Sequence, residues 1–129
     1  MPELTSQQDD QVPVGSALGA ADLIARREIS CRELTGLVLA RVESVNPSLN
    51  ALVGVRAGDA LRDADADAAT LARGERTGPL HGGPVTIEEA FHVAGLRCTW
   101  GNPAWREQIA AEDVTVVQRL RRGGAIVVP

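Results

Sequence analysis

Lysine and tyrosine are absent from this 129-residue chain, and aromatic side chains are scarce. All 13 basic residues are arginines. A phosphate-binding P-loop, a Schiff base and a Ser–Lys dyad each require a lysine, so none of them can form within this chain. Phe91, Trp100 and Trp105 are its only aromatic residues, too few for a platform on which single-stranded nucleic acid stacks. The composition therefore excludes several enzyme classes and one mode of nucleic-acid binding.

The charge and the first residues indicate a cytoplasmic protein. A formal net charge of -4 disfavours nucleic acid as a partner, because polyanion binding draws on clustered positive charge. The first ten residues, MPELTSQQDD, are acidic where a secretion signal is basic. No run approaches the roughly 18 apolar residues of a membrane span, so we expect no membrane partner.

Two cysteines, Cys31 and Cys98, are far apart in the sequence and have no further cysteine or histidine at metal-ligand spacing. A structural zinc site needs four closely organised donors, which this pattern does not supply. We expect no metal site, and we interpret both residues as reduced thiols that pack in the core.

Residues 1–15 are polar, acidic and without hydrophobic periodicity, so we expect a disordered lead-in there. The remaining residues, 16–129, are expected to form a single domain, which suits the length of the chain. Ser16 stands at a helix N-cap position, and apolar residues at helical spacing follow it to about Arg27.

A capping box gives the clearest local signal. Ser30 and Glu33 form the S-x-x-E pattern in which each side chain bonds a free backbone N–H at a helix start. We expect this helix to end before Pro47, since the residue preceding a proline avoids helical conformation. A third helix, rich in alanine, is predicted over 57–73, with Gly74 in a left-handed conformation after it.

Shorter elements follow in the second half. Strands are predicted at 49–55, 85–87 and 125–128, and a last helix is expected to be capped by Asp113 and to end at Gly123–Gly124. An apolar strand so close to the last residue predicts an interrupted domain, because natural domain ends are usually more polar.

Few residues of the chain suit catalysis. Asp63, Asp65 and Asp67 spell D-x-D-x-D, but the glycine and the glutamate that a calcium loop needs later are missing, so we interpret them as a solvated helix edge. All five serines precede residue 50, and none stands in a nucleophile motif. We interpret His81 and His92 as structural or surface residues.

Glu88 and Glu89 are the adjacent carboxylates closest to an expected pocket edge. If both lie on the strand, they point to opposite faces and cannot flank one bond together, although one of them can face a cleft. The residues alone therefore give no complete catalytic constellation.

Motifs along most of the chain resemble the N-terminal part of the amidase signature family. They are G-P-L-H-G-G-P-V-T-I-E-E-A-F-H-V-A-G-L from Gly78 onward, T-W-G-N-P-A-W, and E-D-V-T-V-V-Q-R-L-R-R-G-G-A-I-V-V. The earlier S-C-R-E-L and A-R-V-E-S-V-N-P-S-L-N-A-L-V are similar to the paired leading helices and first strand of that family. The resemblance covers about residues 16–129, in the order and spacing of the family.

This resemblance implies an α/β fold, of which the chain would be an N-terminal fragment with leading helices and the first strands of a mixed sheet. Members of the family hydrolyse or transfer amide groups, so it also implies a small-molecule amide as substrate. Catalysis in the family uses a Ser–cis-Ser–Lys triad, in which the lysine acts through the cis-serine on the nucleophilic serine. No metal or cofactor is implied.

The family motif G-x-P-V-x-[IV]-K-[DE] aligns with residues 82–89. Its lysine position is occupied by Glu88, and Glu89 matches the acidic residue that follows. The family segment with both serines would lie beyond Pro129. No catalytic residue is therefore intact in residues 1–129, and we expect no amide hydrolysis from them.

Three interpretations remain open. The first is a truncated, inactive relic of an amidase, or an incomplete gene model of one. The second is a non-catalytic binding or assembly module, which associates with itself or a larger partner through an exposed strand formed by Ala125, Ile126, Val127 and Val128. The third is an active amidase that uses Glu88 as a base. In the isolated chain we expect exposed apolar patches at that strand and at Leu34, Leu37, Val42 and Val117.

Overall fold

The computed structural model describes residues 15–128, so all but the last residue of the predicted lead-in lies outside the described residues. These residues form helices and a two-stranded parallel sheet of β1 and β2. The elements, in chain order, are α1 Ala17–Ala25, α2 Cys31–Leu49, α3 Ala57–Ala72, β1 Pro84–Val85, the 3-10 helix η1 Pro103–Trp105, α4 Thr115–Arg122 and β2 Ile126–Val127. The fold is the α/β arrangement that the sequence predicts.

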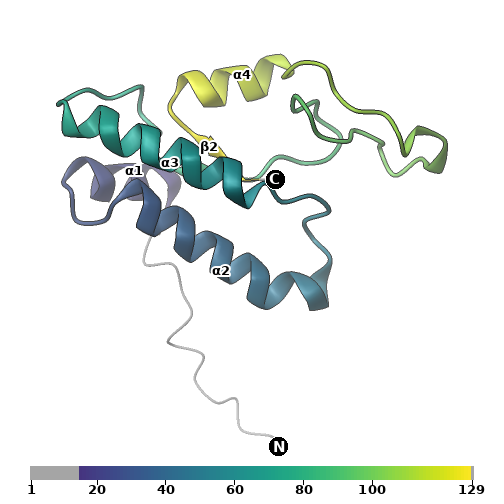
Figure 1. Ribbon diagram of the computed structural model, residues 1–129, viewed down its shortest axis with the longest axis horizontal. Coiled ribbons are helices and arrows are strands. Elements are labelled where there is room, and N and C mark those ends of the chain that lie inside the picture. The colour runs from purple at the N-terminus through teal and green to yellow at the C-terminus, as the bar shows by residue number, and fades with distance from the viewer. Residues whose placement is uncertain (1–14, 129) are drawn as a thin grey trace, which may run out of the picture.

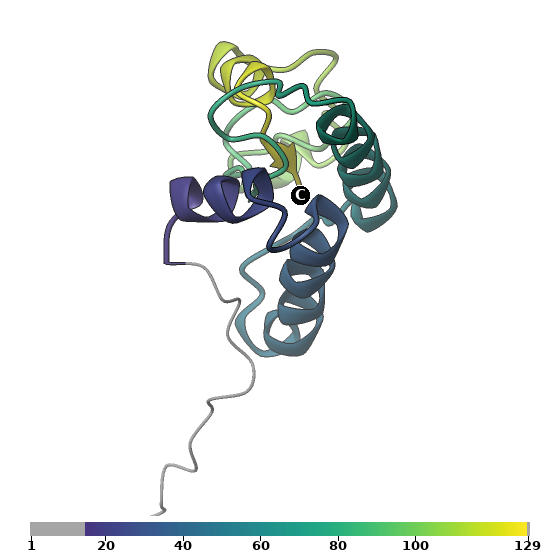
Figure 2. The same cartoon turned by 90° about the vertical axis from the view of Figure 1, so that its left-hand side faces the viewer.

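Helices surround the short sheet (Figures 1 and 2). Figure 2 shows α1, α2, α3 and α4 around β2, and Figure 1 shows a long irregular segment between β1 and α4 that extends away from them. Within residues 15–128, none of the helices combines the length and the apolar character that a membrane crossing requires.

Both faces of β2 are buried. Ile126 and Val128 pack into one core cluster with residues of α1, α2 and α3, and Val127 packs into a second cluster with Val93 and Val117. This alternation follows from the two-residue period of a strand. The expectation that residues 125–128 form an exposed strand is therefore wrong, because all four are buried.

Of the other four apolar residues that we expected to be exposed, most are buried or half-buried. Leu34 and Val117 are fully buried, Val42 is half-buried, and Leu37 alone of these four is exposed, at 44%. Leu34 is buried where α2 packs closely against α3, because the small side chains of Ala60 and Ala64 let the helices approach. Val117 is buried in the second cluster, with Val93 and Val127. Leu34 and Val117 are therefore covered within residues 15–128, whereas Leu37 is exposed, as predicted.

The predicted N-caps of α1 and α2 are confirmed. The Ser16 hydroxyl accepts a hydrogen bond from the Gly19 N–H at 3.0 Å. At the start of α2, Ser30 Oγ accepts from the Glu33 N–H and Glu33 Oε2 accepts from the Ser30 N–H, at 3.0 and 2.8 Å. Helix α3 is followed by Gly74 with φ +80, as the sequence predicts.

The predicted end of α2 is wrong. The helix passes through Pro47 and ends at Asn50, which has the left-handed φ of 49. Proline is tolerated there because its missing N–H removes only one hydrogen bond, near the end of the helix. The predicted strand 49–55 is also wrong, since the Asn46 side-chain amide bonds both the N–H and the C=O of Leu52, each at 2.8 Å.

The segment 78–85 lies alongside 123–128 at close backbone distance. The N–H groups of Leu80 and Gly82 donate to the carbonyl oxygens of Gly123 and Gly124, at 2.8 and 2.9 Å. The Ile126 N–H then donates to Gly83 O at 2.8 Å, which continues the pairing into the sheet. The glycines of the G-P-L-H-G-G-P segment therefore permit a close backbone approach rather than a phosphate site.

Asp113 does not cap α4, contrary to the sequence-based prediction. The N-cap residue is Val114, and no side chain bonds the first turn. Asp113 instead accepts hydrogen bonds from the Ala94 N–H at 2.8 Å and from Arg121 Nε at 2.9 Å. The carboxylate thus ties α4 to the segment after β1, a tertiary contact that the cap pattern does not reveal.

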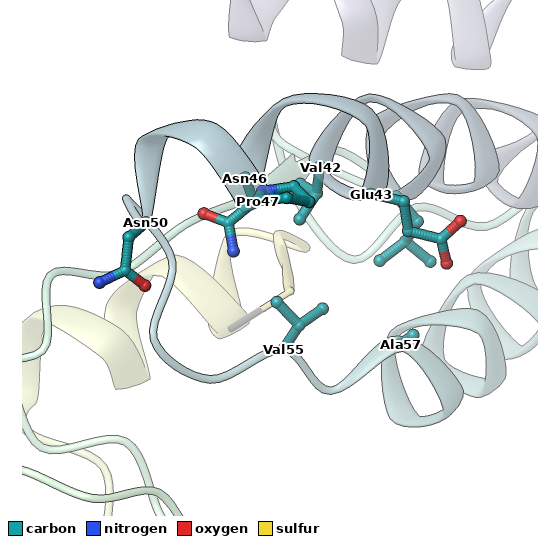
Figure 3. Close-up of a pocket in the computed structure, with 8 residues that line it drawn as sticks. Val42, Glu43, Asn46, Pro47, Asn50, Val55 and Ala57 are labelled. Atoms are coloured by element: carbon teal, nitrogen blue, oxygen red, sulfur yellow. The ribbon is translucent and has the colours of Figure 1, made fainter.

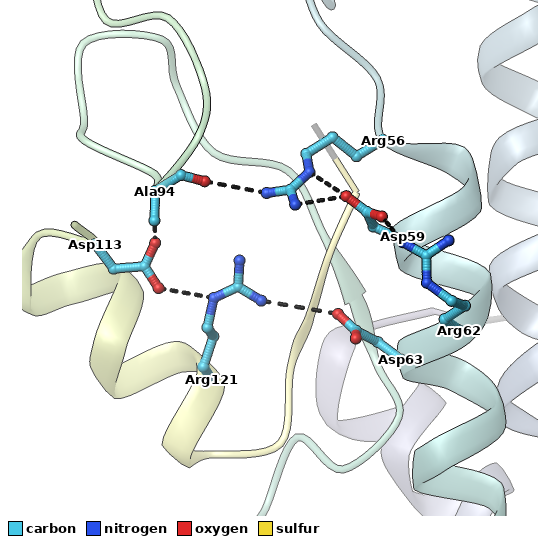
Figure 4. Close-up of polar contacts among 7 residues, drawn as sticks. All are labelled: Arg56, Asp59, Arg62, Asp63, Ala94, Asp113 and Arg121. Atoms are coloured by element: carbon cyan, nitrogen blue, oxygen red, sulfur yellow. Dashed lines mark hydrogen bonds and ion pairs between the residues drawn. The ribbon is translucent and has the colours of Figure 1, made fainter. Parts of the chain in front are cut away.

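Further ion pairs extend this contact to α3 (Figure 4). Arg121 reaches Asp63 on α3 at 3.9 Å, and Arg56 bonds both Asp59 and the carbonyl oxygen of Ala94, at 2.6 and 3.1 Å. The Arg56 side chain, through its hydrogen bond, holds the pKa of Asp59 below its usual value. The network therefore fixes the segment at Ala94 between α3 and α4.

Removing the Asp113 carboxylate is expected to destabilise the fold. Asp113→Ala should lower the free energy of unfolding by about 2 kcal/mol, since it leaves the Ala94 N–H and the Arg121 guanidinium without their acceptor. Urea unfolding of the variant measures the loss. Glu112→Ala is the matched control, because Glu112 is exposed. An equal loss in the two variants would show that the network contributes nothing.

Candidate functional site

An open cleft of about 990 Å³ lies in the second half of the described residues and beside the connector that follows α2. Its walls come from the connector 51–54, from the segment that follows β1, and from the loop 99–109. Apolar side chains dominate the lining, and the polar ones include Glu88, Glu89, Thr86, Thr99, Arg97 and Arg106. The cleft combines an apolar surface with a few polar groups, as small-molecule sites do.

The two adjacent glutamates both line this cleft. The strand β1 ends at Val85, so Glu88 and Glu89 do not lie on a strand, and the strand-based argument that they face opposite sides is wrong. They differ in their surroundings instead. Glu88 is exposed, and its carboxylate makes no hydrogen bond or ion pair in residues 15–128, whereas the carboxylate of the half-buried Glu89 is bonded.

Glu89 binds the backbone of the opposite loop. Its two carboxylate oxygens accept from the N–H groups of Thr99 and Trp100, at 2.5 and 3.0 Å. Hydrogen bonding by Thr99, together with the Trp100 N–H, lowers the pKa of Glu89. The interaction therefore stabilises the fold above the usual pKa of a glutamate, and this contribution is lost as the pH falls through the lower pKa of the folded state.

A serine nucleophile is missing from the described lining of the cleft. None of the serines lies among its lining residues, and the hydroxyl groups there belong to Thr86 and Thr99. The Thr99 hydroxyl accepts a hydrogen bond from the Gly101 N–H at 3.2 Å. Activation of a hydroxyl requires a base within hydrogen-bond reach, and Glu88 has no such partner in the described part of the chain.

His81 is a structural residue, as predicted. It is fully buried, its Nδ1 accepts from the Thr77 N–H at 3.2 Å, and its Nε2 lies 3.0 Å from Asp67 O. Because Nδ1 accepts a proton donor, the proton resides on Nε2, which donates to the carbonyl oxygen. Neither His81 nor the exposed His92 lines the cleft.

The D-x-D-x-D aspartates lie within the regular helix α3, as the helical interpretation predicts. Asp63 faces Arg121, and Asp65 pairs with Arg32 on α2 at 2.5 Å. Burial raises the pKa of Asp67. The three residues therefore do not form a calcium loop.

Both cysteines pack in the interior, which confirms the prediction. Cys31 and Cys98 are unpaired and almost fully buried. Burial, and secondly the charge of Asp67, raises the pKa of Cys31 to about 11. Its thiol is therefore protonated at neutral pH and is a poor nucleophile.

A smaller groove, of about 610 Å³, lies between the end of α2 and the connector that leads into α3. Figure 3 shows Val42 and Glu43 on α2 opposite Val55 on the connector, with Ala57 at the start of α3. The amide of Asn46 in this groove is already bonded to Leu52. The groove contains none of the residues predicted for the site.

The amidase family profile matches residues 33–129, which is most of the chain. The chain therefore belongs to the amidase family. Because the match includes the segment 82–89 and the cleft, the resemblance read from the sequence motifs is confirmed.

Similar proteins agree with this assignment. The chain is 38% identical over 112 residues to one subunit of the glutamyl-tRNA(Gln) amidotransferase of Acidothermus cellulolyticus, covering 87% of this chain and 22% of that protein. It is 37% identical over 111 residues to an acylamidase of Rhodococcus erythropolis, covering 86% and 23%. A solved bacterial aryl acylamidase of the amidase signature family superposes with a TM-score of 0.80 at 25% identity, covering 88% and 24%.

The chain thus spans about a quarter or less of the length of these relatives. The shared part is the N-terminal α/β segment of the amidase signature fold, as the motifs predict.

Proposed function

We propose that this chain is the N-terminal portion of an amide-hydrolysing fold, and that residues 1–129 by themselves do not hydrolyse amides. In the complete fold the substrate would be a small-molecule amide, bound at the cleft between residues 51–54, 86–97 and 99–109. The resemblance to the amidase signature family implies a catalytic lysine at the position of Glu88, and Glu88 lines this cleft.

One observation carries the proposal: Glu88 is an exposed carboxylate at that position, unbonded within residues 15–128, in a chain without lysine. A carboxylate reverses the charge of a lysine and, when ionised, only accepts hydrogen bonds. The described lining of the cleft also holds no serine that a base could activate. Loss of the nucleophile alone costs roughly a millionfold in rate in a triad enzyme, so residues 1–129 are expected to be inactive.

An amidase assay tests the proposal. The purified chain and its Glu88→Ala variant are expected to release no more ammonia from simple aliphatic and aromatic amides than buffer does, because no activated nucleophile is present among the described residues of the cleft. Hydrolysis by the purified chain that disappears in Glu88→Ala would instead make Glu88 the base of an active amidase.

We propose binding or assembly as the second candidate function. All three aromatic side chains are exposed, Phe91 at 45%, Trp100 at 68% and Trp105 at 46%. They lie with Ile109, 54% exposed, on the segment between β1 and α4. Other exposed apolar side chains, such as Leu49 and Val53, lie outside this segment. The three aromatic rings and Ile109 on one segment nevertheless favour a partner surface there rather than at the buried strand β2.

Removing these rings is expected to reduce association. We expect the isolated chain to bind a hydrophobic dye and to elute from size exclusion above its monomer mass. The double variant Trp100→Ser with Trp105→Ser is expected to reduce both the dye binding and the association at least twofold. Leu18→Ser is the control, because Leu18 is 65% exposed but lies on α1. A monomer that binds no dye would remove the support for this candidate.

A further inference from the structure

The loop opposite Glu89 holds two consecutive residues in left-handed backbone conformation. Trp100 has φ +55 and Gly101 has φ +69. The conformation is ordinary for glycine but costs a residue with a side chain roughly 1–2 kcal/mol. Burial of the indole cannot offset this cost, because Trp100 is 68% exposed. The surrounding contacts must therefore hold the turn.

Two side chains satisfy three successive N–H groups of this turn. The Glu89 carboxylate accepts from the N–H groups of Thr99 and Trp100, at 2.5 and 3.0 Å, and the Thr99 hydroxyl accepts from the Gly101 N–H at 3.2 Å. A carboxylate that accepts two backbone N–H groups forms stronger hydrogen bonds than a neutral acceptor does. Glu89 thus provides the contact that can stabilise the left-handed Trp100.

The same contact crosses the cleft. Glu89, Thr99 and Gly101 are all lining residues, and Glu89 directly follows Glu88 in the chain. The carboxylate therefore joins the wall that carries position 88 to the wall formed by residues 99–102. Two further links join these walls. One is the chain that runs between them, and the other is the antiparallel bridge of Arg97 with Ile109.

We propose that Glu89 is a positioning residue that sets the distance between these two walls and thereby the shape of the amide-binding cleft. This inference rests on the proposed function in so far as the cleft binds an amide. The structural part of the inference is that Glu89 stabilises the turn at residues 99–101, and this part does not depend on that function.

Amide hydrogen exchange of the purified chain tests the structural part. In Glu89→Ala, the protection of the Thr99 and Trp100 amides is expected to fall at least tenfold, while the α2 amides keep theirs. Glu88→Ala is the matched control, since the Glu88 carboxylate makes no hydrogen bond within residues 15–128, and should change neither amide by more than twofold. Unchanged protection in Glu89→Ala would overturn the inference.

A conservative variant keeps the test decisive if Glu89→Ala unfolds. Glu89→Asp retains the carboxylate, whereas Glu89→Gln retains one neutral oxygen acceptor. In Glu89→Asp we expect the α2 amides to stay protected. We also expect the Thr99 and Trp100 amides to be at least threefold better protected in Glu89→Asp than in Glu89→Gln. Equal protection in the Asp and Gln variants would also overturn the inference.

The functional part is tested in a chimera, in which residues 16–129 replace the matched part of the Rhodococcus erythropolis acylamidase and Glu88→Lys restores the family residue. There Glu89→Ala is expected to raise KM at least tenfold with kcat changed less than threefold, and Glu89→Asp to rescue KM. Glu107→Ala, at an exposed carboxylate outside the cleft lining, is the control. An unchanged KM in Glu89→Ala overturns the inference. A chimera without activity contradicts the proposed function instead, and the exchange experiment still decides the role of Glu89.

Discussion

Glu88→Lys is expected to raise amide hydrolysis at least about a thousandfold in the chimera of residues 16–129 with the remainder of the Rhodococcus erythropolis acylamidase. The physical reason is the position of residue 88 on the wall of the cleft, where a lysine would meet the serines supplied by the remainder of the fold. Glu88 instead places a negative charge there and, when ionised, has no proton to donate. The initial rate of anilide cleavage, measured for both chimeras at equal concentration, gives the ratio.

The control for this experiment separates the site from the charge. Glu107→Lys makes the same change of charge at an exposed residue that does not line the cleft, and it is expected to leave the chimera with Glu88 inactive. If the chimera with Glu88 were as active as the Glu88→Lys chimera, the assignment of position 88 would be wrong. If neither were active while both folded, residues 16–129 would not replace the family segment.

Gly124→Ala is expected to lower the free energy of unfolding by about 3 kcal/mol. Gly124 has φ +91, where a side chain costs roughly 1–2 kcal/mol. A Cβ atom there would lie 2.6 Å from His81 Cα and 2.9 Å from His81 N, so the backbone must shift, and such overpacking costs a further 1–3 kcal/mol or so. The shift would also disturb the hydrogen bond of the Gly82 N–H to Gly124 O.

Gly74→Ala is the matched control. Gly74 has a similar φ of +80, but apart from its chain neighbours no atom of the described residues lies within 4 Å of the Cβ position, so only the backbone cost of roughly 1–2 kcal/mol remains. Urea unfolding of the two variants and the parent chain separates the effects. Equal losses in the two variants would contradict the role assigned to the close approach of segments 78–85 and 123–128.

Local signals predicted the helices well, because the contacts that start a helix lie within one turn. The Ser30 and Glu33 capping box is an example: both of its hydrogen bonds join residues three apart. The end of α2 was predicted wrongly, because the Asn46 amide bonds Leu52 beyond the helix and the chain accommodates Pro47. That choice depends on a side-chain contact rather than on local preference.

Asp113 shows the same limit. Its position before an amphipathic helix predicts an N-cap, yet its carboxylate bonds Ala94 and Arg121. A cap hydrogen bond and a tertiary hydrogen bond compete for the same oxygens, and the charged Arg121 favours the second. No sequence pattern indicates that residue 94 lies nearby, since nineteen positions separate it from Asp113.

The missing lysine and the order of the family motifs are properties of the sequence by itself. The family and the α/β class follow from them, because residue identity and spacing are enough to establish both. They also predict that Glu88 stands at the lysine position of the family. Tertiary structure alone decided that residues 125–128 are buried and that Glu89, rather than Glu88, bonds the opposite loop. Burial and hydrogen bonding between distant segments depend on which surfaces the folded chain brings together. The sequence around two adjacent glutamates does not indicate which of them makes such a contact.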